Sequence, residues 1–286
     1  MFPPSAFSIA VIASRCLKFS HRKIVAVAED MQKSTAETDA TLRVLAQPES
    51  SMPNWSHEYE ESHCPTNPWN HSTVDVDGVS CERFELRCDD YDPTTLETLI
   101  LRERAEMCET GKLQSKGSDF WYSWSFLVPE DYRDCVAVPH TSGDVTLAQF
   151  HQHFDQDPWD PPWMFGKGTG GDFRVRRFPT YTARELNQMP EAWSLISDSE
   201  FRGAWHEIVV HARWSSREDG FFNVWANGVK RVSYTGPTCF ERGGDIYHKY
   251  GLYRAAYPDN PDAVVLYKDV RRGDSQTEVT TSNLSA

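Results

Sequence analysis

The chain lacks several features that would point to common protein classes. None of its seven cysteines lies in a Cys-x-x-Cys pair or a Cys/His cluster with zinc spacing, which argues against a structural zinc site. No apolar run approaches the roughly 18 to 20 residues that a membrane-spanning helix needs; the longest is residues 7–13. Basic residues are outnumbered, 29 against 42 acidic ones, and the net charge of −13 argues against nucleic acids and anionic membranes as partners.

Apolar and aromatic residues are plentiful enough for a folded protein. The 286 residues are 39% apolar and include ten tryptophans, which argues against disorder and allows one large domain with its own core. Residues 1–52 show no sustained hydrophobic period, and residues 274–286 are polar. We therefore expect a leader and irregular arm over 1–52, a compact domain over 53–273, and a flexible tail over 274–286. We expect this domain to be a monomer.

Cysteines and glycosylation sequons favour secretion. Removal of a leader that contains Cys16 would leave six cysteines, an even number typical of secreted proteins with disulfides. Asn-x-Ser sequons at Asn54, Asn70 and Asn283 lie in polar or Pro-rich stretches that are typical of surface loops. The apolar stretch 7–13 has no early basic residue and makes a weak leader, so a cytoplasmic protein with reduced thiols is the alternative. We predict a secreted glycoprotein with at least one disulfide.

The residue pattern predicts strands rather than helices. Asn227-Gly228 separates two apolar runs, and this dipeptide is the strongest signal for a two-residue hairpin. Helical character is limited to residues 182–201, where Pro190 should break it. The pattern indicates an all-β protein, an antiparallel β-sandwich of the jelly-roll type with short helices. The candidate strands are residues 83–87, 99–107, 120–128, 145–153, 205–214, 221–234, 248–254 and 264–270.

Three of these strands carry a polar face, because residues i and i+2 of a strand point to the same side. A polar face often means only contact with solvent, and an Arg104–Glu106 ion pair or a half-buried His151 would be purely structural. Together, however, the faces supply a guanidinium, an amide, an imidazole, an amine and a phenol. The positions are Arg102, Arg104 and Glu106 in the first strand, Gln149, His151 and His153 in the second, and Lys249, Gly251 and Tyr253 in the third.

These groups suit β-elimination next to the carboxylate of a uronic acid. Abstraction of the C5 proton requires that the neighbouring carboxylate be neutralised, which Arg, Gln or Lys can do by charge and hydrogen bonds. A base must take the proton and an acid must protonate the O4 leaving group. His and Tyr are suited to these two roles.

The three motifs are Arg104-Ala105-Glu106, Gln149-Phe150-His151 and Lys249-Tyr250-Gly251-Leu252-Tyr253-Arg254. In this order, and over roughly residues 80–273, they resemble the strand motifs of the jelly-roll polysaccharide lyases. The pattern is most similar to the heparin lyase and fungal glucuronan lyase group, polysaccharide lyase family 20, and the alginate lyases of family 7 have a similar arrangement.

The resemblance implies a concanavalin-like jelly roll that cleaves an acidic polysaccharide. It implies that Tyr253 and His151 carry the proton transfers and that Gln149 helps to hold the carboxylate. Substrate binding or charge balance would fall to Arg104, Lys249 and Arg254. Family members often hold calcium, but no Asp-rich loop here matches a ligand spacing, so we expect no required cofactor and keep a structural calcium ion as an option.

Two tryptophans are candidates for sugar platforms. Trp159 and Trp163 lie in a Pro-rich stretch directly after the Gln149 strand, where an indole could stack on a pyranose ring. The tryptophans within predicted strands are expected in the core instead.

Two other functions compete with the lyase. A glycoside hydrolase needs two carboxylates that face one cleft, and no strand shows that alternation, so this reading is weaker. A non-catalytic carbohydrate-binding β-sandwich needs only the fold and the aromatic residues. The sequence does not select one polyuronate among glucuronan-like, alginate-like and heparin-like substrates.

Overall fold

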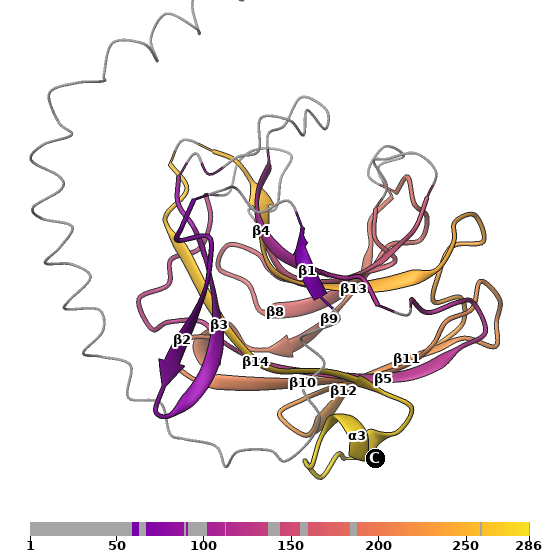
Figure 1. The fold of residues 1–286 in the computed structure, drawn as a ribbon. Helices are drawn as coiled ribbons and strands as arrows, with labels where there is room; N and C mark the ends of the chain where they lie inside the picture. Colours follow the sequence, from indigo (N-terminus) through magenta and orange to yellow (C-terminus); the bar gives the residue numbers. More distant parts are fainter. Residues whose placement is uncertain are drawn as a thin grey trace, which may run out of the picture. The chain divides into compact units, whose positions relative to one another are not determined.

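The computed structural model describes residues 59–62, 67–88, 90, 102–111, 113–136, 144–154, 160–183, 188–257 and 259–285. In this part of the chain two seven-stranded antiparallel sheets pack face to face (Figure 1). Sheet A has the order β1-β4-β13-β6-β7-β8-β9, and sheet B has the order β12-β11-β10-β5-β14-β3-β2. The strands of sheet A are β1 (Tyr59–Ser62), β4 (Arg102–Glu109), β6 (Val145–Gln152), β7 (Trp163–Lys167), β8 (Phe173–Arg177), β9 (Glu191–Ile196) and β13 (Ile246–Ala255). Those of sheet B are β2 (His71–Val76), β3 (Val79–Leu86), β5 (Asp119–Leu127), β10 (Trp205–Arg213), β11 (Phe221–Ala226), β12 (Val229–Thr235) and β14 (Ala263–Gly273).

The predicted fold class is confirmed. The described residues include only a 3-10 turn, η2 (Asp198–Glu200), and a four-residue helix, α3 (Gln276–Val279), besides the strands named above. The predicted hairpin joins β11 to β12, with φ values of 51° at Asn227 and 76° at Gly228. Both positive values fit the tight turn for which Asn-Gly is preferred.

The helix predicted over residues 182–201 is wrong. Residues 184–187 lie outside the described part of the chain, but residues 191–196 form β9, the edge strand of sheet A. Leu195 is buried in the core and Trp193 packs against it, so alternate side chains face inward, as in a strand. Packing against the sandwich therefore decides the structure of this segment.

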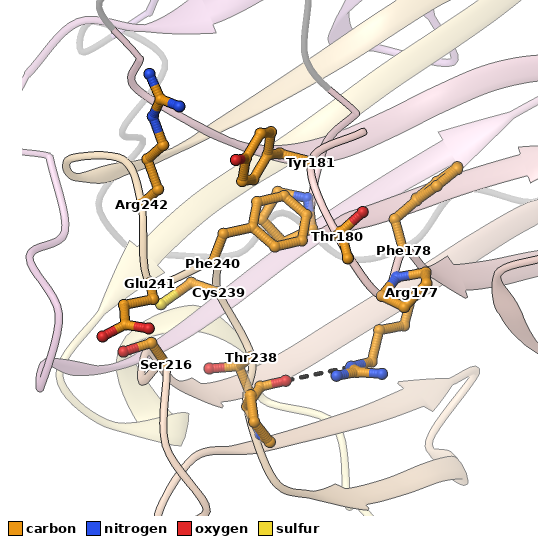
Figure 2. A pocket seen from close by; sticks show the side chains of 13 residues that line it. Arg177, Phe178, Thr180, Tyr181, Ser216, Thr238, Cys239, Phe240, Glu241 and Arg242 are labelled. Atoms are coloured by element: carbon orange, nitrogen blue, oxygen red, sulfur yellow. Dashed lines mark hydrogen bonds between the residues drawn. The ribbon is translucent and has the colours of Figure 1, made fainter. Parts of the chain in front are cut away.

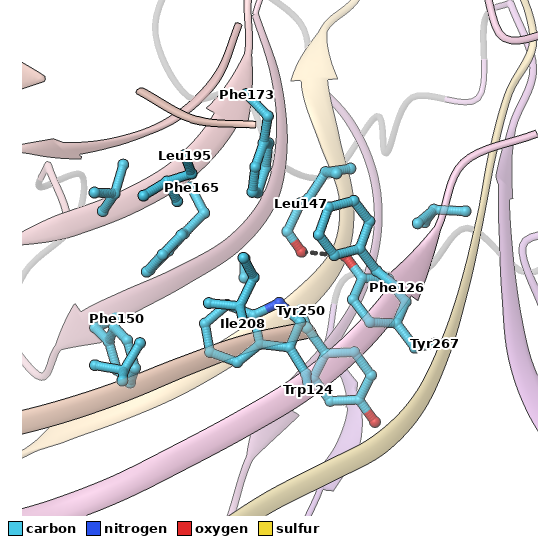
Figure 3. Close-up of a cluster of buried hydrophobic side chains, with 14 of the residues drawn as sticks. Trp124, Phe126, Leu147, Phe150, Phe165, Phe173, Leu195, Ile208, Tyr250 and Tyr267 are labelled. Atoms are coloured by element: carbon cyan, nitrogen blue, oxygen red, sulfur yellow. Dashed lines mark hydrogen bonds between the residues drawn. The ribbon is translucent and has the colours of Figure 1, made fainter. Parts of the chain in front are cut away.

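Aromatic rings from both sheets fill the space between them (Figure 3). Trp124 of β5 meets Phe165 of β7 edge to face, with ring centroids 5.1 Å apart. The Tyr267 hydroxyl of β14 donates a hydrogen bond to the Leu147 carbonyl of β6 at 2.6 Å. These contacts join the two sheets and determine which face of each sheet A strand is turned away from the core.

A histidine lies within this aromatic core. The His248 side chain is 1% exposed, and its ring centroid lies 4.9 Å from that of Trp124 and 5.0 Å from that of Phe150. Its Nδ1 atom lies 3.1 Å from the Tyr59 hydroxyl. Burial, with a smaller contribution from Arg272, lowers the pKa of His248 to about 3, so the ring is neutral in the folded protein.

We expect His248 to make the protein less stable in acid. The unfolded chain protonates this histidine below about pH 6.5, whereas the folded protein does not until about pH 3. Above about pH 6.5, His248 has no effect on stability. As the pH is lowered from about 6.5 towards 3, the free energy of unfolding decreases, and at about pH 5 it is lower by about 2 kcal/mol. In urea unfolding, the pH dependence should be shallower for His248→Gln than for wild type. Parallel curves for the two proteins would contradict the assignment.

The cysteine thiols differ from the predicted disulfides. Five cysteines of the described residues are free, so the predicted disulfide is not found among them; Cys16 and Cys64 lie outside this part. Burial raises the pKa of Cys81, Cys108 and Cys239 to about 11, which keeps these thiols protonated near neutral pH.

The Asn70 sequon is not in an exposed loop. Asn70 is 1% exposed, and its Nδ2 atom donates to the Glu85 carbonyl at 2.9 Å and to Asp90 at 3.0 Å. Asn283 is exposed, and Asn54 lies outside the described residues. In the folded protein a glycan is therefore compatible with Asn283 and incompatible with Asn70.

The segment that follows β14, predicted to be a flexible tail, is held against sheet B. Ser123 Oγ donates to the Val279 carbonyl at 2.6 Å, and Trp225 Nε1 donates to the Ser285 carbonyl at 2.7 Å. Val279 is buried beside Val209 and Trp225. Within the described ranges, no helix has the length and apolar character needed to cross a membrane.

Candidate active site

The three strands with the predicted motifs are direct neighbours in sheet A, in the order β4-β13-β6. Their register aligns the polar residues, because Lys249 lies opposite Gln149, and Gly251 lies opposite Glu106. Tyr250 and Leu252, which alternate with these residues on β13, face the core. The polar side chains therefore share the outer face of sheet A, as predicted from the alternation.

Glu106 joins the amide and the amine. Its Oε1 atom accepts a hydrogen bond from Gln149 Nε2 at 2.7 Å, and its Oε2 atom accepts one from Lys249 Nζ at 2.8 Å. Glu106 is 2% exposed, Gln149 5% and Lys249 7%. The Lys249 charge is thus balanced within the protein. Glu106 also orients the Gln149 amide, because it accepts a hydrogen bond from one of the two N–H groups of that amide.

Two guanidinium groups lie over the phenol ring of Tyr253. Arg104, opposite Tyr253 in the register, places its Cζ atom 4.8 Å from the ring centroid, and Arg102 places its own 5.7 Å away. Arg104 is 8% exposed. Two cationic side chains therefore lie beside Tyr253, in a protein whose net charge is −13.

Gly251 allows β13 to lie close to β4 between Lys249 and Tyr253. Its φ is +131°, which side chains rarely permit, and a Cβ atom there would lie 2.2 Å from the Ala105 carbonyl oxygen. The absent side chain thus brings the two strands together and adjusts the spacing of the residues on either side.

His151 lies farther along the same face. Its ring is stacked on that of Tyr247, the residue opposite it on β13, with centroids 5.4 Å apart. The ring centroid of His153, the second candidate histidine, lies 4.8 Å from that of Tyr247. Tyr247 is therefore the side chain that supports the imidazole.

Tyr253 and His151 lie on opposite sides of Gln149 along the strands. Tyr253 is opposite Thr146 of β6, and Thr146 and His151 are five positions apart. At about 3.4 Å per residue, the backbones of Thr146 and His151 are about 17 Å apart, and Tyr253 lies opposite Thr146. A sugar bound over Gln149 would have the phenol on one side and the imidazole on the other.

Arg254 does not belong to the site. Its side chain is fully buried on the opposite face of β13, where it pairs with Glu103 and donates to the Pro261 carbonyl. The alternation of the strand explains this, since Arg254 follows Tyr253 directly. The predicted role of Arg254 in substrate binding is corrected accordingly.

Trp163 is not a sugar platform. It lies in β7 rather than in a loop, is fully buried, and stacks on Phe222 with ring centroids 3.8 Å apart. Its Nε1 atom donates to the Thr238 carbonyl at 2.8 Å. Trp159 lies outside the described residues.

Three residues that complete the site had no predicted catalytic or binding role. Arg102 and Glu106 were visible on the predicted face of the first strand, but the partners of Glu106 lie more than forty positions away in the chain. Tyr247 precedes Lys249 by two positions, so alternation alone could have placed it on the same face.

The described residues offer no cluster of acidic side chains for a calcium ion. No group of three or more His, Cys, Asp or Glu side chains in this part of the chain is arranged to hold a metal ion. Where two carboxylates do converge, Asp134 and Asp198, the Lys167 ammonium lies 2.8 Å from both and Arg202 lies 3.0 Å from both. Protein cations thus balance these charges, and we derive no step through calcium.

Comparison with known structures agrees with this architecture. The endo-β-1,4-glucuronan lyase of the fungus Trichoderma reesei superposes with a TM-score of 0.57 at 19% identity, over 77% of this chain and 96% of that chain. An alginate lyase, A1-II′, gives 0.53 at 13% identity over 77% and 96%, and the alginate lyase AlyC3 gives 0.52 at 8% over 72% and 78%. No curated protein matches significantly. Residues 50–271 match the family model described as polysaccharide lyase, and because this match spans most of the chain, the protein belongs to the polysaccharide lyase family.

Proposed function

We propose that this lyase cleaves a 4-linked uronic-acid polymer by β-elimination on the outer face of sheet A. The observation that carries the proposal is the hydrogen-bonded set of Glu106, Gln149 and Lys249 beside the Arg104–Tyr253 stack. The structures with similar folds are named as glucuronan and alginate lyases, and both polymers consist of uronic acids.

The first requirement of the reaction is neutralisation of the substrate carboxylate. The second N–H group of Gln149 and the guanidinium of Arg104 are the donors that we propose for this role, while Lys249 is paired with Glu106. As the C5 proton leaves, negative charge moves onto the carboxylate, so these donors bind the transition state more strongly than the substrate.

Tyr253 and His151 carry the proton transfers. One takes the C5 proton, and the electron pair of the C5–H bond forms the C4=C5 double bond as the C4–O4 bond breaks. The O4 oxygen leaves with its electron pair and receives a proton from the other residue. The guanidinium groups of Arg102 and Arg104 stabilise negative charge on the phenol oxygen of Tyr253 during the transfer.

A substrate panel tests the reaction. Purified protein is incubated with polyglucuronate, alginate, heparin and a neutral β-glucan, and the ultraviolet absorbance of the 4,5-unsaturated product is followed. We expect absorbance to rise with at least one polyuronate and not with the glucan, which has no carboxylate to acidify C5. Binding to polyuronates without any rise in absorbance would instead identify a non-catalytic carbohydrate-binding sandwich.

We also propose that the enzyme acts outside the cell on this polymer. Recovery of the protein from culture medium would check this.

A further inference from the structure

A cavity of about 520 Å³ lies outside the set of residues described above (Figure 2). It is formed mainly by the end of β8 with the segment that follows it and by the segment between β12 and β13, and Ser216, between β10 and β11, also lines it. Its volume is within the range of about 300 to 1,000 Å³ that is typical of ligand sites. Two arginines, three aromatic rings and hydroxyl groups line it, among them Arg177, Arg242, Tyr181, Phe240, Thr180 and Ser216.

The lining is suited to binding rather than to catalysis. Glu241 is its one carboxylate, whereas glycoside hydrolysis needs two. The Cys239 thiol is buried and its pKa is raised to about 11, so it is protonated near neutral pH and a poor nucleophile. None of the described residues forms a cluster that could hold a metal ion.

The same lining fits an acidic sugar. The exposed Arg242 places its Cζ atom over the ring of Tyr181, 5.9 Å from the ring centroid, so a guanidinium and an aromatic ring lie close together at the cavity. Arg177 donates to the Pro237 carbonyl at 3.2 Å and forms an ion pair with Glu191 at 3.0 Å, so its charge is balanced within the protein and Arg242 is the cation that the proposal uses. A uronic acid offers a carboxylate for a guanidinium, a ring face for an aromatic side chain and hydroxyls for Thr and Ser.

The cavity wall is packed against the end of the strand that carries His151. Gln152, the next residue of β6, donates to the Phe240 carbonyl at 3.1 Å and accepts from the Phe240 backbone N–H at 2.9 Å. Beyond it, the ring centroids of Phe154 and Tyr181 lie 5.6 Å apart. Met164, opposite Gln149 on β7, belongs to the same apolar cluster as Phe240. These contacts form a continuous packed connection between the active face and the cavity.

From this arrangement we infer that the cavity is a second binding site for the polymer, which holds an acidic sugar remote from the bond that is cleaved. The inference rests on the proposed function, since the polyuronate proposed there as substrate is its occupant. A polymer held at two places gains affinity without a new contact at the reacting sugar, because the second contact is intramolecular.

Binding is tested in the Tyr253→Phe background, so that the polymer is not degraded. Affinity electrophoresis in gels with polyglucuronate, alginate or a neutral β-glucan measures the Kd of each variant. We expect Arg242→Ala and Tyr181→Ala to raise the polyuronate Kd on the order of tenfold, and Tyr181→Phe to leave it nearly unchanged because the ring remains. Arg231→Ala is the matched control, since it removes an exposed arginine at a different place, on β12.

Kinetics of the otherwise wild-type enzyme give a second measurement. Arg242→Ala should raise KM for the polymer while kcat/KM for a short oligosaccharide, which occupies only the active face, stays at the wild-type value. The inference is overturned if both Arg242→Ala and Tyr181→Ala bind the polyuronate as tightly as wild type. It is also overturned if Arg231→Ala loses as much affinity as they do, or if the neutral glucan binds as tightly as the polyuronate. If wild type cleaves no polyuronate but Arg242→Ala still weakens binding, the proposed reaction fails and the second site stands.

Discussion

Replacement of Tyr253 by Phe should lower kcat on the polyuronate substrate by roughly 10² to 10⁴, the contribution of a positioned acid or base. The substitution removes only the phenol oxygen. The ring under Arg104 and Arg102 remains, so the stacking that orients these guanidinium groups is kept. Polymer affinity should therefore stay near the wild-type value, and the loss should appear in kcat rather than in KM.

Initial rates of product absorbance over a range of polymer concentrations separate the two parameters. Tyr234→Phe is a suitable control, because it removes a phenol oxygen from β12 of sheet B, away from the candidate site. Retention of more than about a tenth of wild-type turnover by Tyr253→Phe would exclude Tyr253 as a proton-transfer residue. His151 would then have to serve as both base and acid.

Replacement of Glu106 by Ala should destabilise the protein by about 3 to 5 kcal/mol, because it leaves the buried Lys249 ammonium without its counter-charge. Glu106→Gln keeps the shape of the side chain but no longer holds Gln149 and Lys249 with a negative charge. Since a displacement of about 1 Å can cost on the order of 10²-fold in rate, we expect a loss of that size in kcat for Glu106→Gln.

Urea unfolding near neutral pH measures the stability change, and Asp119→Ala is the control. Asp119 pairs with His211 at 2.7 Å at the surface, so its removal should cost less than about 1 kcal/mol. If Glu106→Ala does not fold, Glu106→Gln combined with Lys249→Met should recover most of the stability, since both charges are then absent, while activity stays low. If Glu106→Ala has the same free energy of unfolding as wild type, the Glu106–Lys249 pair does not stabilise the protein.

The short-range pattern of the sequence determined the fold class and the faces of the central strands. Alternation placed Arg104 and Glu106, Gln149 and His151, and Lys249 and Tyr253 each on one side of a strand, and the structure keeps all three pairs together. The Asn-Gly turn was equally local, because two residues alone decide the backbone of a tight hairpin. The same alternation places Arg254 on the other face.

Only the tertiary structure decided how these strands meet. Glu106 bonds to Gln149 and Lys249 across separations of 43 and 143 residues, and no local pattern specifies such partners. Packing also overrode local preference in residues 191–196, where a predicted helix is an edge strand, and at Trp163, whose Pro-rich surroundings suggested a loop. Apolar side chains are buried wherever the two sheets can cover them, and this depends on the whole sandwich rather than on neighbours in the chain.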